Sequence, residues 1–301
     1  MAAVGERDWS AYNDALVRRG YIGIHPLMLE EWRRELKREN RGKVGLPYRY
    51  PESFVRLIAY MRTIFHLPYR QAEGFVLFLS EHIEGLSVPD YSTIARRTNR
   101  LHLSLDDSIV RSHNPVSIAV DASGIKVHNG GDWIRSIWRV RRKGYLKFHI
   151  AVDIRTGQIV SMDVSSEKVS DGRRMTRLVR RAQESVRVKR VLGDGAYDTK
   201  ANFNFLSERG IRPVIRVAKN SSQKNKGSWA RKMAVVEQQT FRPRAWSRIH
   251  RFGYRWRAEG AFSSVKRIFG EYVSARRFRN MAREMLLKVS IYNGFMAALI
   301  G

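Results

Sequence analysis

One short apolar segment with a single acid, from Ser117 to Lys126, constrains the fold of this chain more than any other. Its small and β-branched residues run without interruption up to Asp121, which is typical of a buried central strand. A carboxylate in such a strand is unfavourable to bury without a hydrogen-bond partner or a metal ion. Taken alone, the segment is explained more simply if Asp121 caps the turn at residues 122–124, and two later segments bear on that choice.

The pattern of secondary structure changes near residue 114, which predicts two parts. Residues 1–114 show the helical spacing of apolar residues, so we expect an all-α N-terminal region. Residues 115–301 alternate strand-like and helical segments, which favours an α/β domain built on a mixed five-stranded sheet with flanking helices. The expected strands cover 117–128, 145–153, 158–166, 188–198 and 211–217.

The end of the chain has a different character. Residues 218–247 are expected to be a loop or irregular segment, followed by a long helix over about 247–269 and a final one over about 281–299. The region from Val217 to Arg257 holds eleven Lys or Arg and one acid, with aromatic residues interleaved. Basic groups contact phosphates and aromatic faces stack on exposed bases, so this composition is typical of a nucleic-acid contact. A basic exposed loop whose aromatic residues are buried in the core is the alternative.

A basic helix ends the predicted N-terminal region. Helical segments over 52–65, 69–82 and 93–102 are joined by short turns, and the last carries Arg96, Arg97 and Arg100. This order fits a DNA contact similar to a helix-turn-helix. A three-helix bundle with a solvated basic face explains it equally well.

The charge balance restricts the partner. The 301 residues include 56 Lys or Arg against 28 Asp or Glu, a formal net charge of +28. Such an excess predicts a polyanionic partner, most often nucleic acid. The absence of Cys excludes a disulfide framework, a thiolate nucleophile and a Cys-based zinc site. With no signal peptide and no membrane-spanning segment in the pattern, we expect a cytoplasmic protein associated with the nucleoid.

Two further acids stand in positions that favour chemistry. Asp194 ends an apolar strand between two glycines, at the edge of a sheet where ligands gather in α/β proteins. Glu259 is predicted on a helix, where Arg255 and Lys266 share its face. An Arg and a Glu four residues apart on a helix usually form only an exposed ion pair. The three acids by themselves are therefore little evidence for a catalytic site.

Taken in order, these motifs resemble the DDE transposases of bacterial and archaeal insertion sequences, most closely the IS-five family. The resemblance depends on SGIKV after the first acid, on DGAYD, and on a helix reading R-x3-E-x6-K. It extends to the N-terminal segments PYRYPESFVRLIAYMR, LPYRQAEGF and VPDYSTIARR, and so covers most of the chain. In one departure, Phe252 stands where the family often has a tyrosine.

The resemblance implies a ribonuclease H-like (RNase H-like) catalytic domain in which Asp121, Asp194 and Glu259 hold two Mg²⁺ ions, for which Mn²⁺ substitutes. Hard cations prefer carboxylate oxygen, and a pair of them can drive phosphodiester cleavage. Without metal, three converging carboxylates repel one another and raise one another's pKa values.

The implied activity is that of a transposase, which binds the terminal inverted repeats of an element, cleaves there and transfers the 3′-OH ends to target DNA. A homodimer is expected, because two ends must be brought together. Residues expected to contact DNA are Arg255, Lys266, Lys126, Arg139, Arg141 and Arg142, together with the three arginines of the basic helix. Arg255 and Lys266 would alternatively only neutralise the acids. An inactive domesticated DNA-binding protein and a metal-dependent nuclease of the same fold are the rival interpretations.

Overall fold

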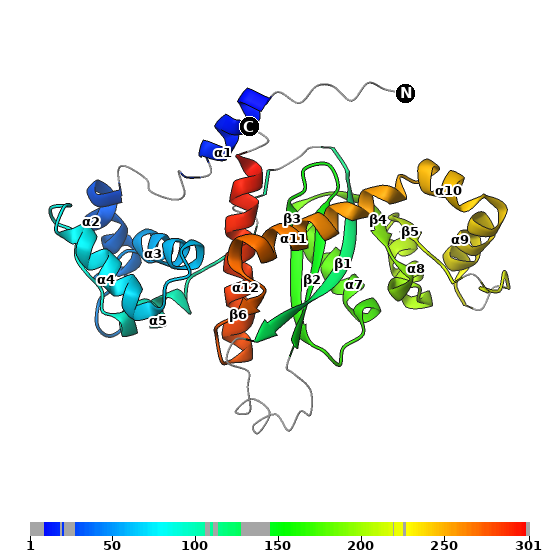
Figure 1. Ribbon diagram of the computed structural model, residues 1–301. Helices are drawn as coiled ribbons and strands as arrows, with labels where there is room; N and C mark the ends of the chain where they lie inside the picture. The colour runs from blue at the N-terminus through cyan, green and yellow to red at the C-terminus, as the bar shows by residue number, and fades with distance from the viewer. Residues whose placement is uncertain are drawn as a thin grey trace. The chain divides into compact units, whose positions relative to one another are not determined.

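The computed structural model describes residues 9–18, 20, 28–105, 109–110, 114–127, 145–218, 220–224 and 227–298. The chain divides into two compact units, residues 1–104 with residue 301, and residues 105–300 (Figure 1). The predicted division after residue 114 lies slightly further along the chain. No helix in the described ranges combines the length and apolar character needed to cross a bilayer.

The N-terminal unit is helical, as expected. Its helices are α1 (Trp9–Arg18), α2 (Met28–Glu39), α3 (Glu52–Ile64), α4 (Tyr69–Ser80) and α5 (Tyr91–Thr98). The core lies between α3, α4 and α5 and includes Phe54, Ile58, Val76 and Ile94. Asp90 caps α5, because its carboxylate accepts hydrogen bonds from the backbone N–H groups of Ser92 and Thr93. This fixes where the basic helix begins.

The second unit is built on one mixed sheet. Its strands are β1 (Val116–Val127), β2 (Tyr145–Asp153), β3 (Ile159–Ser166), β4 (Val188–Gly193), β5 (Arg212–Ile215) and β6 (Tyr272–Val273). The order is β3-β2-β1-β4-β5. Strand β2 is antiparallel to both β1 and β3, whereas β4 is parallel to β1 and β5 is parallel to β4. The short β6 adds to the far end of β1. This confirms the predicted mixed sheet, with β1 as its central strand.

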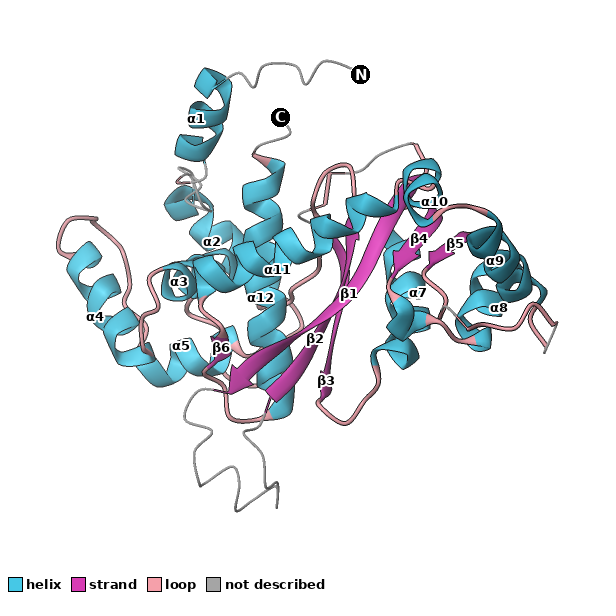
Figure 2. Cartoon of the chain, turned by 45° about the vertical axis from the view of Figure 1, so that its right-hand side comes forward, coloured by secondary structure: helices cyan, strands magenta, loops and turns pink. Residues whose placement is uncertain are grey.

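Helices cover both faces of the sheet (Figures 1 and 2). Helices α11 (Trp256–Phe269) and α12 (Phe278–Ala297) cover one face, and α7 (Met175–Ser185) covers the other. On the first face, Phe148 of β2 meets Phe262 of α11 edge to face, with ring centroids 5.6 Å apart. On the second, Val120 of β1 shares a buried core with Met175 and Leu178 of α7. The core therefore makes β1 rigid on both sides.

Beyond β4 the chain continues through η3 (Gly195–Tyr197) and α8 (Lys200–Glu208) into β5; η2 (Asp171–Arg174) precedes α7. The expectation of an irregular segment over 218–247 holds for the described residues before Trp229 and is wrong beyond them. This part forms α9 (Trp229–Thr240) and α10 (Pro243–Ile249). Ser228 caps α9 with its hydroxyl, and only Ala234 and Val235 of that helix are buried, so its sequence lacks a wide apolar stripe.

The predicted long helix over 247–269 is also interrupted. The chain turns at Arg251, whose φ of 53° lies in the left-handed region, and passes through the 3-10 turn η4 (Phe252–Arg255) before α11 begins. Phe252 packs against Trp246 of α10 at 5.1 Å, so burial of these two rings stabilises the corner. Helical spacing alone did not reveal this break.

Candidate active site

Asp121 within β1 and Asp194 directly after β4 lie at the same level of two neighbouring parallel strands. Ala119 of β1 is paired with Leu192 of β4, and each acid follows two residues later. Asp121 Oδ1 accepts a hydrogen bond from the N–H of Ala122 at 2.9 Å. Asp194 Oδ1 accepts one from the N–H of Ala196 at 2.9 Å and thereby caps η3. Both carboxylates are thus held by local backbone at the carboxyl end of β4.

Glu259 joins this edge through Arg255. The guanidinium of Arg255 donates to Asp121 Oδ2 at 2.9 Å and to Glu259 Oε1 at 2.5 Å. The Asp121 side chain is 17% exposed and that of Glu259 is 57% exposed, so the arginine links an inner acid to an outer one. The prediction that Arg255 and Glu259 share one face is confirmed, and that face is directed toward Asp121.

The electrostatics of Asp121 agree with three acids gathered at one place. Burial raises the pKa of the Asp121 carboxyl above its ordinary value. The N–H of Ala122 and the charge of Arg255 act in the opposite direction, while the charges of Asp194 and Glu259 raise the pKa further. Repulsion between the acids is therefore present, in the direction expected from the sequence.

The donor set fits the expected metal in its chemistry, because three carboxylates offer only oxygen, which Mg²⁺ prefers. Within the described ranges, however, no three side chains of His, Asp or Glu are assembled closely enough to hold one ion. Arg255 lies between two of the three acids and supplies the positive charge that a cation would otherwise bring.

Other predicted residues lie at varied distances from the acids. Lys266 of α11 donates to Ser123 Oγ of β1 at 2.8 Å, on the face that carries Asp121. Lys126 lies further along β1 and pairs with Glu271 at 3.4 Å, with both side chains exposed. The predicted Arg139, Arg141 and Arg142 fall outside the described residues.

The three arginines of the predicted basic helix differ from one another: Arg96 and Arg97 lie on α5, whereas Arg100 lies two residues after that helix ends at Thr98. Arg97 is only 12% exposed, lies 3.6 Å from Glu39 Oε2 and stacks over the ring of Tyr48 at 4.0 Å. It is thus engaged inside its own unit. Arg96 and Arg100 are exposed.

Tyr197 is a residue near the acids that sequence reasoning missed. Its side chain is fully buried and its hydroxyl has no hydrogen-bond partner within the described structure. Burial, and then the charge of Asp121, raise the pKa of this phenol well above its ordinary value. Its place inside the DGAYD motif, three residues after Asp194, was the available signal.

His149 is a hydrogen-bonded core residue of the sheet. It is fully buried on β2, and its Nε2 lies 2.8 Å from Ser165 Oγ. Its Nδ1 lies 3.8 Å from Asp171, which also pairs with Lys147 at 3.1 Å. Burial lowers the pKa of this imidazole, against the opposing charge of Asp171.

Two family models match the sequence, and both describe a transposase DDE domain, over residues 112–293 and 17–130. Among solved structures, a synaptic complex of piggyBac transposase with hairpin DNA aligns over 94% of this chain and 75% of its own, with 9% identity and a TM-score of 0.46. The Drosophila P element transposase in a strand transfer complex aligns over 62% of this chain and 41% of its own, with 12% identity and a TM-score of 0.32. Both scores are low, so the family assignment depends on the sequence matches.

Proposed function

Since the chain belongs to the family with a transposase DDE domain, we propose that it is an active DNA transposase of an insertion sequence, of the IS-five type. It binds the terminal inverted repeats of its element, cleaves phosphodiester bonds there and joins the freed 3′-OH ends to target DNA. The observation that carries this proposal is the arrangement of the three acids, with Asp121 and Asp194 on adjacent parallel strands and Glu259 tied to Asp121 through Arg255.

In this proposal the three acids are the catalytic residues and hold two Mg²⁺ ions. Asp121 on the central strand, Asp194 after β4 and Glu259 on α11 would supply the carboxylate oxygens that hold them. When bound, the ions lower the pKa of water and stabilise charge on the oxygens of the scissile phosphate. The rigid β1 and β4 hold Asp121 and Asp194 in place, and the more exposed Glu259 closes the site from α11.

The basic residues of the same face position DNA. Arg255 exchanges its carboxylate partners for a phosphate when DNA and metal arrive, which a guanidinium does well because it binds both kinds of oxygen in a fork. Lys266, whose ammonium group donates a hydrogen bond to Ser123 Oγ on β1, offers a second phosphate contact. Lys126, further along β1 and on the opposite face of that strand, is proposed as a separate DNA contact.

End recognition is assigned to the N-terminal unit. Arg96 on the capped helix α5 and Arg100, two residues after that helix ends, both face solvent, where they are available to DNA. Two ends must be processed together, so the working form is a homodimer.

The test uses labelled duplexes taken from the DNA that immediately flanks the coding sequence on either side. Wild-type protein nicks one of them in Mg²⁺ or Mn²⁺, and Asp121→Asn abolishes nicking while binding of the duplex persists. Binding without nicking by the wild type would support an inactive DNA-binding protein instead. Nicking without joining to a plasmid target would support a nuclease.

A further inference from the structure

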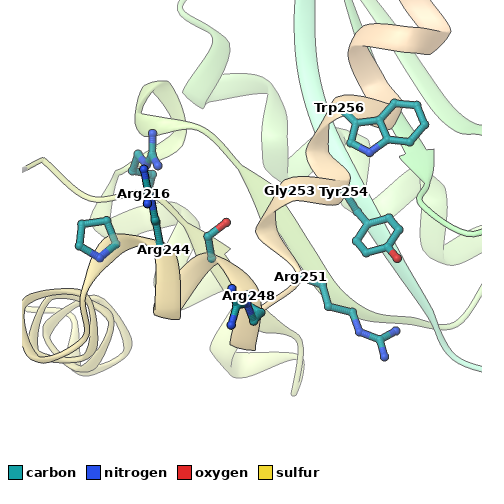
Figure 3. Close-up of a pocket in the computed structure, with 9 residues that line it drawn as sticks. Arg216, Arg244, Arg248, Arg251, Gly253, Tyr254 and Trp256 are labelled. Carbon is teal, nitrogen blue, oxygen red and sulfur yellow. The ribbon is translucent and has the colours of Figure 1, made fainter. Parts of the chain in front are cut away.

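A groove lined by arginines lies beside the acids, in the part of the chain that was expected to be irregular. Its lining, which we call the arginine groove, combines the end of β5, the helix α10 and the corner leading to α11, with a volume of about 670 Å³. It is formed by Arg216, Pro243, Arg244, Ser247, Arg248, Arg251, Gly253, Tyr254 and Trp256. Figure 3 shows Arg216, Arg244 and Arg248 toward one end, Tyr254 and Trp256 at the other, and Arg251 between them.

The charge of the arginine groove is of one sign. No Asp or Glu lines it. Within the described ranges, its four arginines form no ion pair with a carboxylate, although the acids beside the groove are paired with Arg255. Four guanidinium groups brought together repel one another, and an anion placed among them relieves that repulsion. The arginine groove therefore fits a ligand with more than one phosphate.

The aromatic end of the groove is open to solvent although it consists of large rings. Trp256 is 52% exposed and Tyr254 is 43% exposed, whereas Trp246 and Phe252 are buried behind them. The guanidinium of Arg257 lies 4.6 Å from the Trp256 ring centroid, which holds the indole in place. Exposed rings next to phosphate-binding groups are the arrangement with which proteins bind unpaired nucleotides, since a base offers its face only when it is unstacked.

The backbone supports the same interpretation at Arg251. Its left-handed φ of 53° is unfavourable for a residue with a Cβ, and glycine would adopt it without strain. An arginine kept at such a corner places a charge between the basic and aromatic ends of the groove, which a glycine could not do.

The arginine groove also continues into the site of the acids, because Trp256 follows directly after Arg255, the residue bound to Asp121 and Glu259. A strand lying in the groove would thus lead to the scissile phosphate.

We propose that the arginine groove binds a short unpaired stretch of DNA, a few nucleotides long, next to the bond that is cut. Its bases stack on Trp256 and Tyr254 and its phosphates contact the arginines. The volume lies in the range of small-ligand sites, about 300–1,000 Å³, which suits a few nucleotides and not the face of a duplex. This inference rests on the proposed function, which supplies the DNA.

The test measures binding in EDTA, where no cleavage occurs, by fluorescence anisotropy of a labelled oligothymidylate and of a hairpin duplex of equal charge. For the full-length protein we expect Trp256→Ala to weaken binding of the single strand about tenfold, the effect of losing one stacked base. Duplex binding should change less than twofold. Trp229→Ala is the matched control, because Trp229 is 61% exposed on α9 and outside the groove.

Arg251→Gly separates ligand binding from folding. The glycine removes the strain, so the melting temperature stays equal or rises, while affinity for the single strand falls several-fold. Arg187→Gln, which removes one exposed charge before β4, should leave that affinity within twofold. Equal losses for single strand and duplex, or equal losses in the control variants, would overturn the inference. Because nicking by the wild type is measured separately, the arginine groove can fail as a strand site while the transposase proposal stands.

Discussion

At the scale of single residues, Arg255 decides the state of the site in the absence of metal. It neutralises the mostly buried Asp121 at 2.9 Å and the exposed Glu259 at 2.5 Å. A half-buried carboxylate that loses such a partner is left with its desolvation and with the repulsion of the other acids. The arginine therefore stabilises the metal-free fold and competes with the ions that the acids are proposed to bind.

We predict that Arg255→Gln lowers the free energy of unfolding in EDTA by about 1–3 kcal/mol. Addition of Mg²⁺ should restore more stability to the variant than to the wild type, because the acids no longer have a competing cation. Thermal unfolding across a Mg²⁺ titration measures both effects. Arg267→Gln, at an exposed position on the same helix, should change stability by less than about 0.5 kcal/mol in either condition.

His149 provides a pH dependence whose sign follows from its environment. Burial lowers the pKa of the folded imidazole below the value of about 6.5 in an unfolded chain. Below that pH the unfolded state takes up a proton that the folded state does not, so stability is complete above pH 6.5 and falls as the pH decreases. We predict that His149→Gln makes unfolding less dependent on pH between 7.5 and 5.5. Parallel curves for the variant and the wild type would contradict this.

The three acids were predictable from sequence because each stands at the end of an apolar strand or on a helix in a recognisable order. Neutralisation of the acids by Arg255 was only an alternative at that stage, and its pairing with Asp121 in particular was not predictable, since Asp121 lies more than a hundred residues earlier and only the sheet brings the two together. The same holds for Tyr197, whose burial depends on α7 packing over it.

At the scale of elements, prediction failed where local pattern and tertiary packing disagree. Helix α9 buries only Ala234 and Val235 among its apolar positions, so neither composition nor period indicated a helix. The break before α11 depends on packing of Trp246 against Phe252, a contact that no helical periodicity records. The strands, by contrast, retain a continuous apolar pattern, because helices pack on both faces of the sheet and bury them.

The contact between α12 and β3 gives a prediction at this scale. Asn293 is fully buried, accepts a hydrogen bond from the N–H of Ile159 at 2.8 Å and donates one to its carbonyl at 2.8 Å. Asn293→Ala leaves both backbone groups unpaired, and we expect it to lower the free energy of unfolding by about 2–4 kcal/mol. Gly294→Ala on the same helix, at an exposed position with open space for a Cβ, should stabilise by up to about 1 kcal/mol. Chemical denaturation checks the pair.

At the scale of the whole molecule, the net charge of +28 predicts that DNA binding is driven by the release of cations from the DNA phosphates and therefore depends on salt. The contribution of each basic residue depends on whether it faces solvent. Arg96 and Arg97 on α5 and Arg100 just after it provide an internal comparison. Arg97 is paired with Glu39 and stacked on Tyr48, while Arg96 and Arg100 are exposed.

If α5 contacts the phosphates of the element ends, each exposed arginine displaces about one cation from the duplex, and removing it changes the salt dependence accordingly. We therefore predict that the double variant Arg96→Gln/Arg100→Gln reduces the slope of log affinity against log salt by about two. Arg97→Gln should leave that slope unchanged and instead lower the melting temperature, because its charge is used within the unit. Anisotropy titrations between 50 and 200 mM salt, the range over which such contacts differ measurably, give the slopes. An unchanged slope in the double variant would assign end recognition to another surface and leave α5 as an ordinary helix of a bundle.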